Sequence, residues 1–566
     1  MKKKIRLHPS RSVALFFVTA IVLLYGVIYP NLSVVISSFQ RAGSWTLANY
    51  RELLSQRIVI EAIVSSLGLS IGTVVLCAIV GVPLAFLFER FTFPGRRLFA
   101  ALAALPLVLP PLVGTVAFIF LFGESGILAH GIQNLLALES APWRLRGWPA
   151  LLLFHTYTMY PFFYVLTGAG LRRIDASLAE AARSLGASKT VVLRRVLLPQ
   201  LTPSLLAAAL LTFMTSMASF SAPLFFGGDV RVLTLEIFTA RQRGDIVIAV
   251  TETVILAIIS LAALIVFQRY EGTQKFAAAA MKGAPRRRVS ITSGKARALA
   301  MIVAVVFAVI LVAPVATLFL VSFAREGSWT TQTFPSAYTL ENYQRLFAEP
   351  YAAEVFFNSF TMSAIAAVAA LVWGFCVVTL LRRRRNETKL AGEGWRRLLS
   401  LLVLIPWALP GTVVAVSVAE AYGQPNPLLG SFVLVGTFWI LPVVYFLRFM
   451  PLVVRALQAS MEQLDPTLEE AAGSLGARAW QRFMRVTLPL VWPGAVAGTL
   501  LAFVIALGEY VASVLVFVPA NRPISIAIAS ELRDFNLGAA AAYGVVLIVI
   551  ISISMVVAGK LERLRG

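Results

Sequence analysis

Charged side chains are scarce in this sequence. Asp, Glu, Lys and Arg make up 13% of the 566 residues, whereas hydrophobic residues make up 59%. Soluble globular domains carry about 25% charged residues, so the composition excludes a chain built from such domains. Because long apolar runs recur along the whole length, the sequence predicts an all-α polytopic membrane protein.

Cysteine is rare, and the common catalytic motifs are missing. The two cysteines, Cys77 and Cys376, both lie inside apolar runs, which excludes a disulfide framework and a cysteine-based metal site. The sequence contains no Gly-x-x-x-x-Gly-Lys-Ser/Thr phosphate loop and no His-Glu-x-x-His pair. We therefore expect no catalytic residues, no metal ligands and no cofactor in this chain, which by this reasoning is not an enzyme.

Acidic residues are outnumbered by basic ones, 27 against 49, and the formal net charge is +22. The basic residues gather in short segments between the apolar runs, and such segments remain on the cytoplasmic side of a membrane. Their alternation predicts that both termini are cytoplasmic. We attribute the charge to this topology and to contact with anionic membrane lipid, and we expect no nucleic acid partner because no basic soluble domain is present.

The apolar runs are long enough to be membrane spans, since a helix needs about 20 apolar residues to cross a bilayer. The twelve expected spans are residues 13–37, 61–88, 98–123, 149–168, 203–226, 246–267, 298–322, 355–381, 398–422, 431–448, 493–517 and 538–559. The first run is too long for a signal peptide and lacks a small-residue cleavage pattern. We therefore interpret it as a retained span.

Short motifs recur between the two halves of the chain. "TLANY" at Thr46 is matched by "TLENY" at Thr339, and "LPLVLPP" at Leu105 by "IPWALPG" at Ile405. Six spans per half is an even number, so the second half enters the membrane in the same direction as the first. The sequence predicts two parallel repeats related by a pseudo-two-fold axis along the membrane normal. The expected domains are a first repeat at 1–268, a basic cytoplasmic linker at 269–297 and a second repeat at 298–566.

The most specific repeat is a charged segment after the fourth span of each half. "EAARSLGASKTVVLRRVLLP" and "EAAGSLGARAWQRFMRVTLP" belong to stretches of 33 residues that share 14 identities. Each predicts a helix that ends at a glycine, Gly186 or Gly476, because a left-handed residue suits a helix C-terminus. A second helix is expected from near Ser188 or Arg478 to the Leu-Pro pair. One such segment could be an amphipathic helix lying in the headgroups, but two copies in equivalent loops favour a pair of cytoplasmic docking elements.

This segment resembles the cytoplasmic signature of permease subunits of binding-protein-dependent ABC importers, in which Glu-Ala-Ala is followed by a glycine and then by Leu-Pro. The resemblance implies that each loop docks on one of two copies of a separate ATP-binding subunit, which binds the ATP and Mg. The implied docking residues are Glu180, Ala181, Ala182, Gly186, Pro199, Glu470, Ala471, Ala472, Gly476 and Pro489. The chain departs from strict repetition where Arg183 is matched by Gly473, so the two docking surfaces differ in charge.

Several expected spans are interrupted by helix-breaking or polar residues. Breaks in the third span of each half are predicted at Pro106, Pro110, Pro111, Pro406, Pro410 and Gly411. The offset of 290 residues that relates the two charged segments sets Ser219 and Phe220 opposite Glu509 and Tyr510. We predict that these four residues line a translocation pathway between the halves.

Three ionisable residues inside spans leave alternatives open. Glu509 could face the pathway or form a structural salt bridge or hydrogen bond with a neighbouring span, and Glu252 has the same ambiguity. His155 is expected to be a packing residue whose hydrogen bonds are satisfied by its neighbours.

The layout, in which one chain supplies both six-span halves, resembles that of permeases for ferric iron and, secondarily, for thiamine, phosphonates and polyamines. The resemblance implies an extracytoplasmic solute-binding protein as a further partner and a location in the bacterial plasma (inner) membrane. We expect a small hydrophilic solute, with ferric iron as the first choice. A secondary transporter of the major facilitator type also has twelve spans in parallel halves, but it has no use for paired docking loops. A membrane-embedded enzyme would need a nucleophile or metal cluster that the sequence does not contain.

Overall fold

The computed structural model describes residues 9–278, 288–329, 332–348, 350–382, 393–425 and 432–563. The first-half helices are α1 Pro9–Leu23, α2 Tyr29–Ser38, α3 Ala48–Ser55, α4 Arg57–Arg90, α5 Arg96–Leu102, α6 Pro111–Phe122, α7 Ile127–Leu135, α8 Gly147–Arg173, α9 Ala176–Ser184, α10 Lys189–Val192, α11 Leu198–Met217, α12 Ser221–Phe226, α13 Leu233–Gln242 and α14 Ile246–Ala278. The second-half helices are α15 Gly294–Val321, α16 Glu341–Ala348, α17 Pro350–Arg382, α18 Glu393–Ala408, α19 Gly411–Tyr422, α20 Ile440–Glu462, α21 Pro466–Ser474, α22 Ala479–Arg482, α23 Leu488–Leu507, α24 Ser513–Val516, α25 Ile524–Arg533 and α26 Leu537–Arg563.

Short turns and strands complete the described chain. The π-helical turns are η1 Leu24–Ile28, η3 Leu193–Leu197 and η5 Phe483–Thr487, and the 3-10 turns are η2 Leu105–Val108 and η6 Pro519–Asn521. Strands β1 Gln40–Arg41 and β2 Ser44–Trp45 pair antiparallel, and β3 Phe91–Thr92 and β4 Val289–Ser290 pair parallel. The expected all-α membrane fold is therefore confirmed for the described residues.

Ten helical segments in the described residues are long and apolar enough to cross a bilayer, and the bent pair of α18 and α19 brings the number to eleven. The expected count of twelve is not reached by length and apolar character alone. The remaining expected span, 149–168, lies in α8, which has 27 residues but carries polar side chains such as His155 and Thr158. Thr158 donates to the Phe154 carbonyl of its own helix, and His155 bonds side chains of α4 and α11, against which α8 packs.

The third span of each half is broken as predicted at Pro110 and at Pro410, but the break predicted at Pro406 is wrong, because this proline lies inside α18. In the first half, Pro110 separates η2 from α6. In the second half, α18 and α19 meet at 105° across Leu409 and Pro410. Proline lacks a backbone N–H and its ring clashes with the preceding turn, so a helix cannot continue straight through these positions.

The expected span at 431–448 is wrong in its position. The helix begins only at Ile440 and continues to Glu462. The described residues before it, 432–439, are mostly apolar but not helical, because Gly436 has a φ of +87°. The prediction failed because hydropathy alone does not distinguish an apolar loop from a helix.

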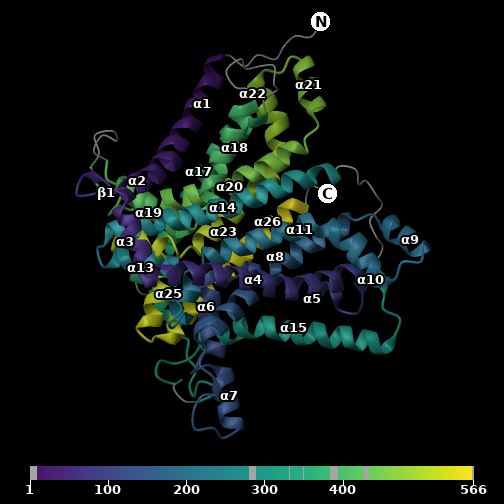
Figure 1. Ribbon diagram of the computed structural model, residues 1–566, viewed down its shortest axis with the longest axis vertical. Coiled ribbons are helices and arrows are strands. Elements are labelled where there is room, and N and C mark those ends of the chain that lie inside the picture. The colour runs from purple at the N-terminus through teal and green to yellow at the C-terminus, as the bar shows by residue number, and fades with distance from the viewer. Residues whose placement is uncertain are drawn as a thin grey trace.

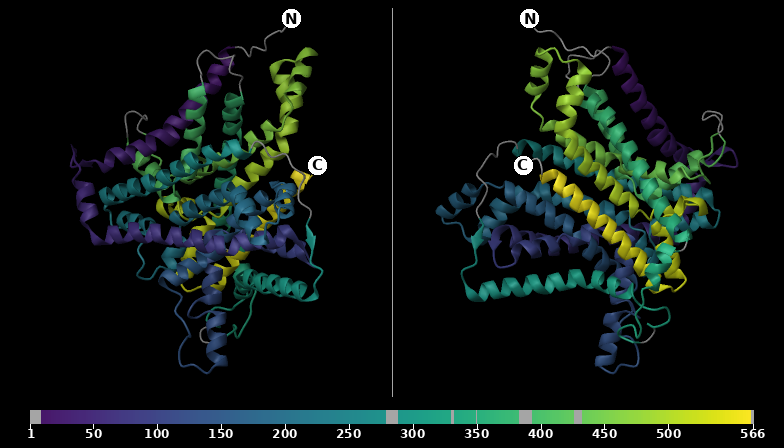
Figure 2. Two further views of the ribbon diagram at one scale, coloured as in Figure 1. Left: turned by 45° about the vertical axis from the view of Figure 1, so that its right-hand side comes forward. Right: turned by 180° about the vertical axis from the view of Figure 1, so that it is seen from behind.

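The two halves repeat the same packing and also interlock. α4 packs against α8 and α11, and α17 packs in the same way against α20 and α23. The first span of each half crosses to the other half, because α2 packs against α19 and α15 packs against α6 (Figure 1). The two halves therefore share helix-to-helix contacts rather than forming separate bodies (Figure 2).

The recurrence of "TLANY" and "TLENY" has a structural cause. In each copy the threonine hydroxyl accepts a hydrogen bond from the backbone N–H two residues on, at Ala48 and Glu341. Asn342 Nδ2 donates to the carbonyls of Ser322 and Ala324, both at 2.9 Å. Its counterpart Asn49 donates to the carbonyls of Ser38 and Gln40. The tyrosine hydroxyls, at Tyr50 and Tyr343, bond a serine hydroxyl at the end of the preceding helix.

We expect Asn342→Ala to lower the free energy of unfolding by about 1–3 kcal/mol, because two buried carbonyls lose their donor. Asn49→Ala should have a similar effect. The control is Asn134→Ala, whose amide reaches Thr333 at an exposed site and whose loss should change stability little. Denaturant or thermal unfolding of the purified chain measures all three. Equal stability of Asn342→Ala and the wild type would contradict this account.

Candidate functional site

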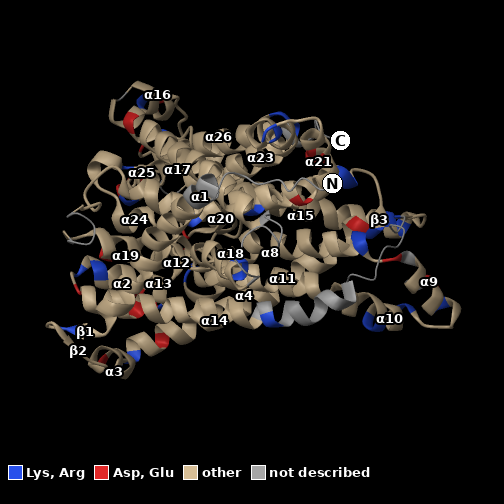
Figure 3. Cartoon of the chain, turned by 90° about the horizontal axis from the view of Figure 1, so that it is seen from above, with Lys and Arg blue, Asp and Glu red and all other residues tan. Residues whose placement is uncertain are grey.

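The two charged repeats fold into matching helix-turn-helix loops at the same end of the molecule. In Figure 3, α9, α10 and α21 lie toward one end together with β3, while β1, β2, α3 and α16 lie toward the other. The first helix of each loop is capped by an aspartate, because Asp175 and Asp465 each accept a hydrogen bond from the backbone N–H two residues on, at 2.9 Å. The hydrogen bond from Thr467 lowers the pKa of the Asp465 carboxyl.

The first helix of each loop is followed by the predicted turn at a glycine. Gly186 has a φ of +83° and Gly476 a φ of +86°. The N–H of Gly186 donates to the Arg183 carbonyl and the N–H of Ala187 to the Ala182 carbonyl, and the second loop repeats both bonds. This hydrogen-bond pair reverses the chain in a Schellman motif, for which glycine is the best suited residue because a side chain strains a positive φ. The expected turn is confirmed in both copies.

The second helix of each loop begins where it was expected, at Lys189 and Ala479, but it does not end at the Leu-Pro pair. It passes through a π turn, η3 or η5, into the long helix α11 or α23. Pro199 and Pro489 are the second residues of those long helices. Because proline lacks an N–H and clashes with the carbonyl four residues back, the wider π turn lets the helix continue.

The placement of the remaining docking residues is the same in both loops. Glu180 and Glu470 are exposed, as are Ala181 and Ala471, whereas Ala182 and Ala472 are partly buried. Sequence reasoning missed Leu185 and Leu475, which are each 89% exposed. Both loops thus expose a large apolar side chain at the same position, next to the glycine turn. The sequence could have pointed to these two residues, since each leucine directly precedes the repeated glycine.

The two loops differ in one local detail that follows from the Arg183 and Gly473 mismatch. A Cβ at Gly473 would lie 3.0 Å from Arg482 Nη1, so the glycine leaves room for this arginine to cross the docking helix. Thr487 Oγ1 also donates to Glu469 Oε1 at 2.6 Å, which ties the second docking helix to its π turn. The second loop therefore has two side-chain contacts that the first loop cannot form, because Arg482 and Thr487 are replaced there by Val192 and Leu197.

The four predicted pathway residues lie at the breaks that follow α11 and α23. The rings of Phe220 and Tyr510 meet at 5.8 Å between centroids, which brings the two breaks together across the pseudo-two-fold axis. A Cβ at Gly508 would lie 2.8 Å from the Cβ of Pro110. The break in the fifth span of the second half therefore touches the break in the third span of the first half. We call the region where these breaks meet, around Phe220, Tyr510, Gly508 and Pro110, the seam.

Ser219 is held by a neutral hydrogen bond. His155 Nε2 lies 2.8 Å from Ser219 Oγ, and His155 Nδ1 lies 3.1 Å from Ser216 Oγ and 3.3 Å from Thr73 Oγ1. His155 is fully buried. The expectation that this histidine is a satisfied packing residue is confirmed.

Glu509 is engaged in an ion pair with Arg448 of α20. The carboxylate is 6% exposed, and its Oε1 also accepts the N–H of Ala512 at 2.9 Å. The guanidinium fills the space where a Cβ at Gly411 would be, at the start of α19. Glu509 therefore forms the salt bridge with a neighbouring span that the structural interpretation of this residue predicted. Sequence reasoning missed Arg448, which lies in an apolar run and carried no repeat signal.

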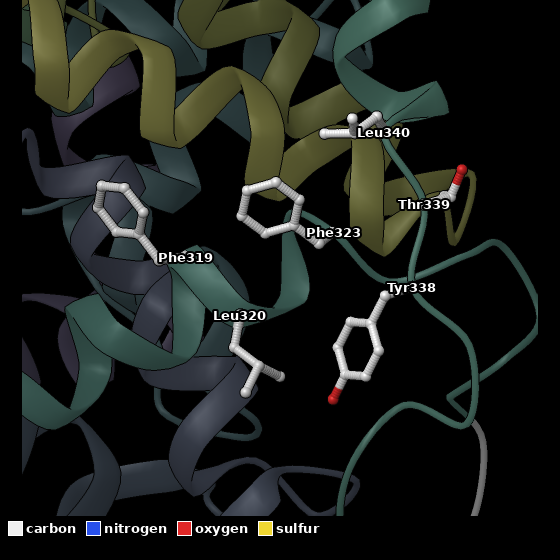
Figure 4. A pocket seen from close by; sticks show the side chains of 6 residues that line it. All are labelled: Phe319, Leu320, Phe323, Tyr338, Thr339 and Leu340. Carbon is white, nitrogen blue, oxygen red and sulfur yellow. The ribbon is translucent and has the colours of Figure 1, made fainter.

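Two other features do not join the seam. Glu252 of α14 is 2% exposed, and its Oε2 has no hydrogen-bond partner among the described residues. An open hollow of about 680 Å³ is formed by Phe319, Leu320 and Phe323 at the end of α15 and by residues 338–340 (Figure 4). Its lining is mostly apolar, so it offers no charged group to a hydrophilic solute.

The fold and the loops define a class: a polytopic membrane protein built from two interlocked repeats, each with its own helix-turn-helix loop. Comparison with known families agrees. Residues 60–271 and 389–565 both match the family described as "Binding-protein-dependent transport system inner membrane component". The chain belongs to this family and is the permease subunit of a binding-protein-dependent ABC importer, with no catalytic role of its own.

Three relatives illustrate the range of this family. A Sinorhizobium fredii protein whose name describes an ABC transporter permease is 32% identical over 94% of this chain and 93% of that protein. The ferric transport system permease protein FbpB of Actinobacillus pleuropneumoniae is 24% identical over 94% of this chain and 75% of its own length. PhnV of Salmonella paratyphi A, named for a 2-aminoethylphosphonate transport system, is 28% identical over 48% of this chain and 97% of its own.

We expect Glu509→Gln to lower stability, because removal of one partner of a buried ion pair typically costs about 3–5 kcal/mol. The double variant with Arg448→Met should recover part of this loss, since no unpaired charge remains. Ser219→Ala at the equivalent position of the first half is the matched control and should cost less. Thermal stability and solute uptake of the same purified complexes are measured together. Full stability of Glu509→Gln with reduced uptake would instead favour a direct pathway role.

Proposed function

We propose that this permease imports ferric iron. Two relatives over most of the chain support this choice, because the Actinobacillus protein and a Haemophilus influenzae protein, matched over 89% of this chain at 24% identity, are named as ferric transport permeases. Thiamine, phosphonates and polyamines are the alternatives. An extracytoplasmic solute-binding protein would deliver the solute at the end of the molecule opposite the docking loops.

Two copies of an ATP-binding subunit would dock on the paired loops and supply the energy, with ATP and Mg bound in those subunits. The observation that carries this proposal is the identical form of the loops. Both present an exposed glutamate, an exposed alanine and a leucine that is 89% exposed around a left-handed glycine. Docking would put the loops on the cytoplasmic side of the bacterial inner membrane, the side on which the basic segments of the sequence also predict both chain termini.

Transport would follow when nucleotide binding draws the two docked subunits together. Each docking loop continues through a π turn into a helix that ends at the seam, as in α10, η3 and α11. A displacement of the loop is therefore transmitted along one helical rod to Ser219 or Glu509. Glu509 could contact a cationic solute only after its ion pair with Arg448 opens, because the carboxylate is otherwise neutralised. Ser219, Phe220 and Tyr510 are the other proposed pathway residues.

We expect Gly186→Pro and Gly476→Pro to leave the protein inserted in the membrane but to uncouple transport. Proline cannot adopt a φ near +85°, and it removes the N–H that closes each turn. Solute-stimulated ATPase activity of the complex in proteoliposomes should fall strongly for both variants. The matched control is Gly294→Pro at the start of α15, where the helix N-terminus tolerates proline. Wild-type stimulation in both loop variants would exclude the coupling role.

The substrate is tested by reconstituting the permease with its ATP-binding subunit and its solute-binding protein. Ferric iron should accumulate in proteoliposomes in an ATP-dependent manner, and the Gly186→Pro variant should abolish this uptake. Unlabelled thiamine, phosphonate and polyamine serve as competitors. Accumulation of one of these solutes, with no iron uptake, would overturn the iron proposal while leaving the docking proposal intact.

A further inference from the structure

A basic pocket of about 550 Å³ lies beyond the end of α4, apart from the seam. Two distant parts of the chain form it. Arg96, Arg97 and Leu98 come from the start of α5, and Arg288 comes from the segment that leads into the second half. The described residues that line the pocket include three guanidinium groups and no carboxylate.

The pocket is built on a defined framework. Strand β3 pairs with β4, so that Phe91 lies opposite Val289 and Thr92 opposite Ser290. The N–H of Ile291 extends the pairing by donating to the Thr92 carbonyl. Arg96 Nη1 donates to the Phe88 carbonyl at 2.7 Å. These contacts hold both contributing segments against the end of α4.

The positive charges around this pocket are only partly balanced by protein. Glu89 accepts from Arg288 Nη2 at 2.9 Å and also pairs with Arg172, so one carboxylate serves two arginines. Arg96 bonds only a backbone carbonyl, and its burial and the nearby Arg288 guanidinium both lower the pKa of Arg96. Arg97 is exposed and forms no ion pair within the described part of the chain. Like charges at this spacing repel, and an anion between them would relieve that repulsion.

The position of the pocket indicates where the anion comes from. Arg90 is the last residue of α4, a 34-residue helix that qualifies as a membrane span, so the pocket lies at one end of that span. Leu98 at its rim is 61% exposed. A guanidinium cluster beside an exposed leucine at the end of a span matches the headgroup and upper acyl chain of a phospholipid. Figure 3 marks Lys and Arg positions in blue along the backbone near β3, with an acidic position in red beside them.

We propose that the pocket formed by Arg96, Arg97 and Arg288 binds the phosphate group of an anionic phospholipid. Guanidinium groups bind phosphate oxygens through paired charge-assisted hydrogen bonds. The bound headgroup joins the start of the second half to the first half at the β3–β4 pairing, so it stabilises the contact between them.

Native mass spectrometry and thermal unfolding of the purified full chain test this site with phosphatidylglycerol as the probe. The wild type should retain phosphatidylglycerol, and its unfolding midpoint should rise when that lipid is added. Arg97→Gln, alone and combined with Arg288→Gln, should lose the retained lipid and the rise in midpoint. The single variant changes an exposed side chain without an ion pair, so it should fold normally.

The matched control is Arg51→Gln combined with Arg57→Gln, two exposed arginines near the opposite end of α4. This control should retain lipid as the wild type does. Phosphatidylcholine and inorganic phosphate are added in parallel. A rise in midpoint with inorganic phosphate alone, lost in the Arg97 variant, would assign the site to free phosphate and overturn the lipid source. Equal retention of phosphatidylglycerol by the wild type and the double variant, or equal loss in the control, would overturn the site itself.

Discussion

Every break in a membrane helix leaves backbone groups that lipid cannot satisfy, and this constraint organises the structure around the seam. At the break after α11, the carbonyl of Ser219 accepts Thr234 Oγ1 at 2.7 Å. At the break after α23, the carbonyl of Glu509 accepts the hydroxyls of Ser513 and Ser525, both at 2.7 Å. Each break is thereby hydrogen-bonded to helices further along the chain, the first to α13 and the second to α24 and α25. Irregular backbone is tolerated at this depth because protein, not lipid, surrounds it.

The interlocked first spans extend this fastening across the two halves. Tyr422 Oη of α19 donates to the Tyr25 carbonyl, and Tyr157 Oη of α8 donates to the Leu311 carbonyl of α15. A helix from each half is therefore bonded to the other half. Because one continuous helical path joins each helix-turn-helix loop to its break, a movement of the loop would displace the seam and strain these cross-half contacts together. This arrangement suits rigid-body motion better than local rearrangement.

The sequence predicted those features that a single residue type determines. Gly186 and Gly476 end their helices because other residues are strained at positive φ, and Pro110 and Pro410 mark breaks because proline removes a donor. Features that depend on tertiary neighbours were not predictable. In the sequence Arg448 is a single charge in an apolar run, and nothing there indicates its contact with Glu509. The apolar residues before Ile440 resemble part of a span, although Gly436 keeps them out of the helix.

The two breaks at the seam are alike in backbone and unlike in chemistry. His155 and Ser219 are neutral, so they can exchange partners with water or a solute at modest cost. Arg448 and Glu509 attract each other across a buried contact, and their separation exposes two charges to a medium that solvates them poorly. Two identical ATP-binding subunits acting on matching loops would therefore meet unequal resistance at the seam. The break in the second half would stay closed until other partners replace the ion pair between Arg448 and Glu509. A cationic solute at Glu509, together with an anion or water at Arg448, would be such partners.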